Sequence, residues 1–390
     1  MKMTDVCPLA EELTLFSLGR MSYENMESVA KHLVACVVCE NLLDELHRTN
    51  VDSTDDLIAA LRAPMDAEPF SQEDCCEIVM SVSEFVAERL AGQRVGSEPV
   101  AGTMMAGCRL NEPLAYGSFG TVYRAIDLES SELRAVKVLS RFRFGDERIE
   151  ARFDREAELL LALDHPNIVK VFQRGRQDGV PFLVMEMIDG VSLSALMRLV
   201  GKIDLPDACQ LVCQVALGLQ HASAKGVIHR DIKPSNIMLS WAGSVRVLDF
   251  GLAVMTFDES PSKRLTESGQ VLGTPDYIAP EQVKDSRKAD LRSDLYSLGC
   301  VFYELLSGKP PFRDLRSTLA KMRAHRREHP VPIELVAHSI PAEIASLIGS
   351  LLAKAPDDRP QSPTEVISVL QPWLAKSDLP SLAERCRKRT

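Results

Sequence analysis

The chain has 390 residues, of which 45% are hydrophobic and 26% charged; this is ordinary globular usage and excludes wholesale disorder and fibrous repeats. Its length predicts two or three domains. It has no run of 18 or more apolar residues, and its first residues lack a basic segment followed by an apolar one. We therefore expect no transmembrane helix, no secretory signal and a cytoplasmic location.

Charge divides the chain into two chemically different parts. Residues 1–107 carry 7 Lys and Arg against 19 Asp and Glu, a net charge of −12. The rest of the chain carries 38 basic against 36 acidic side chains, a net charge of +2. An acidic segment repels nucleic acid and anionic membranes, so we expect protein partners for the N-terminal part and no nucleic acid.

The N-terminal part contains a candidate metal site. His32, Cys36 and Cys39 have the spacing His-x3-Cys-x2-Cys, which on a helix keeps the three side chains within reach of one ion. Tetrahedral zinc needs four such ligands, and Cys7 could supply the fourth. The alternative is a helical pair in which these cysteines are simply buried, because a free Cys behaves as a small hydrophobe.

Helical signals continue up to a linker. Ser71 precedes an acid by three residues, as in a capping box, and apolar residues then recur at helical spacing from Ile78 to Leu90. The following stretch is rich in Gly, Ser and Pro, which predicts a linker. The expected order is a helical, zinc-binding domain at 1–47, a helical regulatory segment at 48–91 and a linker at 92–107.

Beyond the linker the pattern becomes α+β. A small strand-rich lobe precedes a larger helical lobe. Strands are predicted at Gly120–Ile126, Arg134–Leu139 and Phe182–Glu186, and helices at Glu147–Leu163, Pro206–Lys225 and Ser293–Ser307.

A glycine-containing stretch lies between two of the strand-like runs. Its glycines would let backbone N–H groups approach phosphates without a Cβ in the way, although a tight hairpin has the same pattern. The stretch consists of Leu114, Ala115, Tyr116, Gly117, Ser118, Phe119, Gly120, Thr121 and Val122.

Four further features follow in a fixed order. Lys137 lies on an apolar strand, where its charge needs a partner, and Glu156 is a candidate for that partner. Downstream come His229–Asn236, then Asp249-Phe250-Gly251, then Ala279-Pro280-Glu281. This ordered set is the protein-kinase signature.

On these motifs, residues 108–374 resemble a bacterial, eukaryotic-like (Hanks-type) serine/threonine protein kinase. The resemblance implies a bilobal kinase fold with an N-lobe at 108–187 and a C-lobe at 188–374, followed by a basic tail at 375–390. It extends to a substrate-docking loop at 273–281. It implies transfer of the γ-phosphoryl group of ATP to Ser or Thr of protein substrates, with Mg²⁺, in bacterial signalling.

The resemblance also implies residue roles. Asp231 would accept the hydroxyl proton, Lys233 would neutralise the transferring group, and Lys137, fixed by Glu156, would hold the α- and β-phosphates. The metal ligands would be Asn236 and Asp249, and the residues around ATP would be those of the glycine-containing stretch with Ala135, Met185, Glu186, Met187 and Met238. Two supports are expected, Glu281 paired with Arg359 and Asp294 beneath the catalytic loop. Ala115 departs from the family at its first loop glycine; we expect a tighter loop there rather than lost activity.

Regulation follows from the same resemblance. Arg230, beside the catalytic Asp231, implies a phosphate on the activation segment, for which Thr266 and Ser268 are the candidates. A homodimer would allow autophosphorylation; the alternative is a merely hydrophilic loop.

The sequence around Cys7 and His32–Cys39 resembles the zinc finger of bacterial anti-sigma factors. This resemblance implies a regulatory or sigma-factor-like protein partner for residues 1–95. Two other functions stay open: a catalytically silent scaffold that binds nucleotide, and a regulator acting mainly through its N-terminal part.

Overall fold

The computed structural model divides the chain into two compact units, residues 1–100 and residues 101–390. It describes residues 102–117, 120–139, 157–250, 275–285, 288–315, 317–337 and 339–389. Several predicted site residues lie outside these ranges and keep the status of predictions: Cys7, His32, Cys36, Cys39, Ser118, Phe119, Glu156, Thr266 and Ser268.

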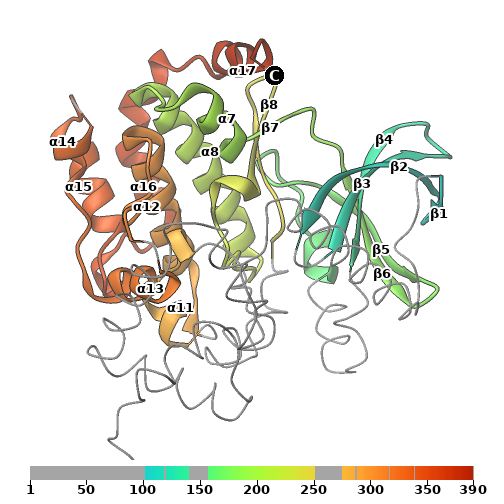
Figure 1. Ribbon diagram of the computed structural model, residues 1–390, viewed down its shortest axis with the longest axis horizontal. Helices are drawn as coiled ribbons and strands as arrows, with labels where there is room; N and C mark the ends of the chain where they lie inside the picture. The colour runs from blue at the N-terminus through green and yellow to red at the C-terminus, as the bar shows by residue number, and fades with distance from the viewer. Residues whose placement is uncertain are drawn as a thin grey trace, which may run out of the picture. The chain divides into compact units, whose positions relative to one another are not determined.

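The N-terminal lobe of the second unit is built on a six-stranded antiparallel sheet in the order β1-β2-β3-β4-β6-β5 (Figure 1). Its strands are β1 Met104–Met105, β2 Cys108–Gly117, β3 Gly120–Asp127, β4 Leu133–Leu139, β5 Val171–Gln177 and β6 Val180–Glu186. Residues 157–161 are helical. The three strands predicted from sequence are therefore confirmed.

One face of this sheet forms a small core of its own. Leu110, Ala125 and Val136 are fully buried in it, and Phe182 and Val184 of β6 pack beside them. Alternate residues of a strand point to opposite faces, so β4 buries Val136 on one side and Ala135 on the other. This register fixes which side chains of β4 face the second lobe.

The second lobe is mainly helical (Figure 1). Its helices are α7 Leu193–Val200, α8 Leu205–Ala224, α11 Pro280–Lys284, α12 Leu291–Ser307, α13 Thr318–Arg327, α14 Ile333–Val336, α15 Ala342–Leu351, α16 Pro363–Leu370 and α17 Leu379–Arg387. Short 3-10 turns add η2 Pro234–Asn236, η3 Pro275–Tyr277, η5 Pro356–Asp358 and η6 Gln371–Lys376. A three-stranded sheet completes the lobe: β7 Gly190–Ser192, β8 Ile237–Ser240 and β9 Val245–Val247.

Helices α8 and α12 form the centre of this lobe. Both begin with an Asp N-cap, and both bury apolar side chains around most of their circumference. Tyr296 and Phe302 of α12 are fully buried. A helix buried on all sides makes a rigid base, and the polar side chains of α12 that point out of it can hold loops in place.

Two boundaries differ from the sequence prediction. Met104 and Met105 fall inside the stretch predicted as linker but form β1, paired with Arg109 and Cys108. The stretch 375–390, predicted as a basic tail, contains α17, which buries Leu379 and Cys386 with two neighbours in the main core.

Helix α17 is held by polar contacts as well. Asp207 of α8 accepts hydrogen bonds from Ser377 Oγ (2.9 Å) and Asp378 N (2.8 Å). Arg389 donates to the carbonyl of Leu199 at the end of α7 (2.8 Å). Gly243, in the β8–β9 turn, has a φ of +83°, and a Cβ there would overlap Pro380 of α17.

None of the helices in the described part of the chain combines the length and the apolar character of a membrane span.

Candidate active site

The loop that follows α8 carries the predicted catalytic aspartate. Asp231 Oδ2 lies 2.8 Å from Lys233 Nζ and 3.0 Å from Asn236 Nδ2, which also donates to the Asp231 carbonyl. Asn236 ends the turn η2 and is buried. These contacts hold the Asp231 carboxylate in one position while leaving over a third of its side chain exposed (37%).

The same loop is fixed from below by α12. Asp294 Oδ2 accepts a hydrogen bond from His229 N (2.8 Å), and its Oδ1 accepts one from Arg230 N (2.7 Å). Burial raises the pKa of Asp294, although the nearby His229 and the two N–H donors act against it. The expected support of the loop by Asp294 is confirmed.

The second lobe also presents Asp249, at the end of the segment that follows β9. Its Oδ1 lies 2.7 Å from the Nζ of Lys137, which β4 carries in the first lobe. Lys137 is 4% exposed, so its charge needs a partner. Burial acts to raise the pKa of Asp249, but the charge and hydrogen bond of Lys137 outweigh it, and the pKa lies below its ordinary value. The carboxylate is therefore ionised at neutral pH.

Hydrogen bonds tie the two acidic segments together. His229 Nε2 contacts the carbonyl of Leu248 (2.7 Å), and Leu248 N donates to the carbonyl of Asn236 (2.8 Å). The rings of His229 and Phe250 lie 4.7 Å apart. Asn236 is thus held beside the residue that precedes Asp249.

Two residues of this region have strained backbones. Arg230 has a φ of +67° and Asp249 a φ of +58°, the left-handed region that few residues other than glycine adopt. Such strain persists where surrounding contacts fix the conformation, and it concentrates at functional sites. Here it sets the directions of Asp249 and of the residue preceding Asp231.

Several residues predicted to lie around ATP belong to the main core cluster or pack against it. Ala135 pairs with Met185 across β4 and β6, and both are buried. Val122, Met187 and Met238 are partly buried and pack against the same core cluster. Gly120 has a φ of +139°, and a Cβ there would overlap the Val138 carbonyl, so β3 begins against β4 only with glycine at this position.

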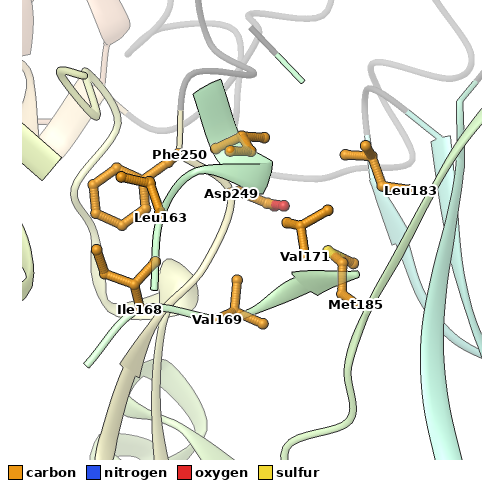
Figure 2. A pocket seen from close by; sticks show the side chains of 9 residues that line it. Leu163, Ile168, Val169, Val171, Leu183, Met185, Asp249 and Phe250 are labelled. Carbon is orange, nitrogen blue, oxygen red and sulfur yellow. The ribbon is translucent and has the colours of Figure 1, made fainter. Parts of the chain in front are cut away.

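Met185 of β6 lines an apolar cavity. Side chains from the 157–161 helix and its following turn, from β5 and β6, and from Asp249 and Phe250 line it (Figure 2). Among the described residues that line it, only Asp249 carries a charged group (Figure 2). The remaining lining residues are Leu160, Leu163, Ile168, Val169, Val171, Leu183 and Met185.

A buried ion pair supports the segment after the activation loop. Arg359 donates to both oxygens of Glu281 (2.7 and 2.8 Å), and its guanidinium side chain is fully buried. Ser293 Oγ also donates to Glu281 (2.6 Å). The pairing predicted from sequence is confirmed, and paired buried charges of this kind avoid the high free energy of an isolated one.

Comparison with known proteins agrees with this arrangement. A family model described as protein kinase domain matches residues 109–374, more than half of the chain. The chain belongs to the Hanks-type protein kinase family. The kinase fold predicted from sequence, with a β-sheet lobe and a helical lobe, is confirmed by solved kinase structures.

Among its relatives is the serine/threonine-protein kinase PknB of Mycolicibacterium smegmatis, 38% identical over 261 residues, covering 66% of this chain and 41% of that protein. PknB of Mycobacterium tuberculosis is 37% identical with the same coverage. The chain thus spans about two fifths of the length of these curated relatives. The solved structure of the PknI kinase domain of Mycobacterium tuberculosis is 25% identical, with a TM-score of 0.56, and covers 71% of this chain and all of that chain.

Two contacts of the site were not predicted from the sequence. Lys137 was expected to pair with Glu156, and its direct contact with Asp249 was not expected. Gln282 Nε2 donates to the carbonyl of Arg230 beside the predicted catalytic aspartate (2.9 Å). Neither contact has a signal in sequence spacing, because the partners are far apart along the chain.

The support from Asp294 gives a testable prediction. Asp294→Asn preserves the shape of the side chain, but its NH₂ group would face the backbone N–H of either His229 or Arg230. Leaving a buried donor without an acceptor costs about 1–3 kcal/mol. We expect a loss of unfolding free energy of that size in urea, and a kcat at least about tenfold lower because Asp231 is displaced. The exposed Asp314→Asn is the control. An Asp294→Asn enzyme with unchanged kcat would contradict the role of Asp294.

Proposed function

We propose that this chain is an ATP- and Mg²⁺-dependent kinase that phosphorylates Ser or Thr of protein substrates. The observation that carries the proposal is the contact between Lys137 and Asp249. Asp231 lies on a loop that hydrogen bonds join to the segment of Asp249. Phosphoryl transfer requires mainly positioned groups and charge neutralisation, which this arrangement supplies. The relatives named serine/threonine-protein kinase support the choice of substrate hydroxyl.

Each residue has a definite part in this proposal. Asp231, whose side chain is partly exposed, would accept the proton of the substrate hydroxyl. Lys233, 2.8 Å from it, would neutralise the transferring phosphoryl group. Lys137 would bind the α- and β-phosphates, with Glu156 as its further partner.

The side-chain oxygen atoms of Asp249 and Asn236 are suitable ligands for magnesium. Magnesium prefers carboxylate, amide and phosphate oxygens. Lys137 donates to Oδ1 of Asp249, so Oδ2 of Asp249 could bind the ion. Asn236 donates to Asp231 through its Nδ2, so the amide oxygen of Asn236 could be a second ligand. Asp249 and Asn236 would hold the ion, which would neutralise charge on the phosphates of ATP.

Incubation with labelled ATP tests the proposal. The wild-type chain should transfer label to itself or to a general protein substrate. Asp231→Asn should lower the rate by roughly 10²–10⁴-fold, because the general base is lost. Asp164→Asn, an exposed aspartate of the same lobe junction, should leave the rate unchanged. A nucleotide-binding scaffold would show no transfer that depends on Asp231.

The same incubation tests autophosphorylation. We propose that Thr266 or Ser268 receives the phosphate and that Arg230 binds it. Arg230 supports this, because its Nε is buried without a hydrogen-bond partner among the described residues, and phosphate is a strong acceptor for such a group. A homodimer would allow one copy to modify another. An active kinase with an unmodified segment would contradict this part of the proposal.

For the N-terminal part, we propose a structural zinc ion held by Cys7, His32, Cys36 and Cys39 in a domain that docks a regulatory protein. The ligand spacing and the acidic charge of residues 1–107 support it. Zinc analysis should find about one ion per chain. Changing Cys36 and Cys39 to Ser should remove it, whereas Cys75→Ser should not. A zinc-free wild-type chain that folds fully would contradict this site.

A further inference from the structure

The segment that enters α11 lies between the catalytic loop and the helices of the second lobe. Gln282 binds it to the carbonyl of Arg230, as described above. Ser297 Oγ of α12 donates to the Tyr277 carbonyl (2.7 Å), and the Tyr277 hydroxyl donates to Glu304 (2.5 Å). A shift of this segment would therefore move its contact with the catalytic loop.

An ion pair also anchors this segment to α13. Lys321 Nζ lies 2.6 Å from Asp276 Oδ1. The side chain of Asp276 is 3% exposed and that of Lys321 13%, so the pair is shielded from water. Asp276 Oδ1 accepts no hydrogen bond of regular geometry among the described residues, so the Lys321 charge is its observed compensation. Shielded pairs interact far more strongly than those on the surface, and removing one partner leaves an uncompensated charge.

Helix α13 is itself a fixed support. Ser317 caps its N-terminus by accepting from Ala320 N (3.0 Å). At its other end the fully buried His325 contacts the hydroxyl of Tyr296 on α12 (2.8 Å). Lys354 lies beside the same hydroxyl (3.3 Å). Lys321 therefore projects from a helix that is anchored to the centre of the lobe.

We propose that Lys321 is a positioning residue for the protein substrate. Its pairing with Asp276 holds the segment 275–285 against α13, and Gln282 of the same segment contacts the catalytic loop. The proposal rests on the proposed kinase function, in which residues 275–281 of this segment belong to the substrate-docking loop. Lys321 touches neither nucleotide nor Asp231 in this assignment, so its effect falls on the protein substrate and not on ATP.

Kinetics and hydrogen exchange of the full chain test the proposal. In Lys321→Met, KM for a protein or peptide substrate should rise about tenfold, because displaced docking groups lose their alignment. KM for ATP should stay within about twofold, since no ATP-contacting group moves. Amide exchange over residues 275–285 should accelerate, as expected for a segment that has lost an anchor. The exposed Lys225→Met, at the end of α8, is the matched control and should change none of these.

Two further variants separate positioning from general destabilisation. Lys321→Arg keeps the charge and should restore substrate KM to within about threefold of wild type. Asp276→Asn combined with Lys321→Met should do no more harm than the worse single change, because partners in one pair are not additive. Additive losses, equal effects on both KM values, or unaltered exchange in Lys321→Met would overturn the proposal.

Failure of the kinase function itself would look different. A wild-type chain without phosphoryl transfer would refute the proposed function, while the exchange measurement, which needs no activity, would still decide whether Lys321 holds the segment.

Discussion

The ion pair between Lys137 and Asp249 is the contact on which the active site depends. It joins a strand of the first lobe to the loop after β9 in the second, over 2.7 Å. Lys137 is almost entirely buried, so its charge requires an acidic partner, which Asp249 of the second lobe supplies. The same pair keeps Asp249 ionised, which is the state in which a carboxylate binds a metal ion. One interaction thus couples the arrangement of the lobes to the chemistry of the site.

The second lobe supports this contact with buried polar groups rather than apolar packing alone. Asp294 holds the catalytic loop through two backbone N–H groups, and Glu281 holds the following segment through Arg359. Buried charges add little to stability compared with apolar side chains of similar volume, but a unique set of partners specifies one geometry. Helix α12 contributes Asp294 and Ser293 to these contacts, so one buried helix positions both segments. This explains why strained residues such as Arg230 keep their conformations.

Local patterns predicted much of this arrangement from sequence. Lys137 was recognisable because a charge on an apolar strand needs a function, and the loop motif placed Asp231 and Asn236 together. The helix α17 was not predicted, because basic residues in its last turn are also typical of a solvated chain end. Yet Leu379, Leu382, Ala383 and Cys386 recur at intervals of three, one and three residues, the pattern of a buried helix face. The pairing of Lys321 with Asp276 leaves no such pattern, since it depends on how two distant segments pack.

A double-mutant cycle on nucleotide affinity tests the central claim most directly. Mg²⁺-dependent binding of a fluorescent ATP analogue would be measured for wild type, Lys137→Met, Asp249→Asn and the double variant. If both residues serve one nucleotide site, the losses will not add, and the coupling will be about 1 kcal/mol or more. Losses that add within about 0.5 kcal/mol would mean that the two residues act independently, and the account would be wrong.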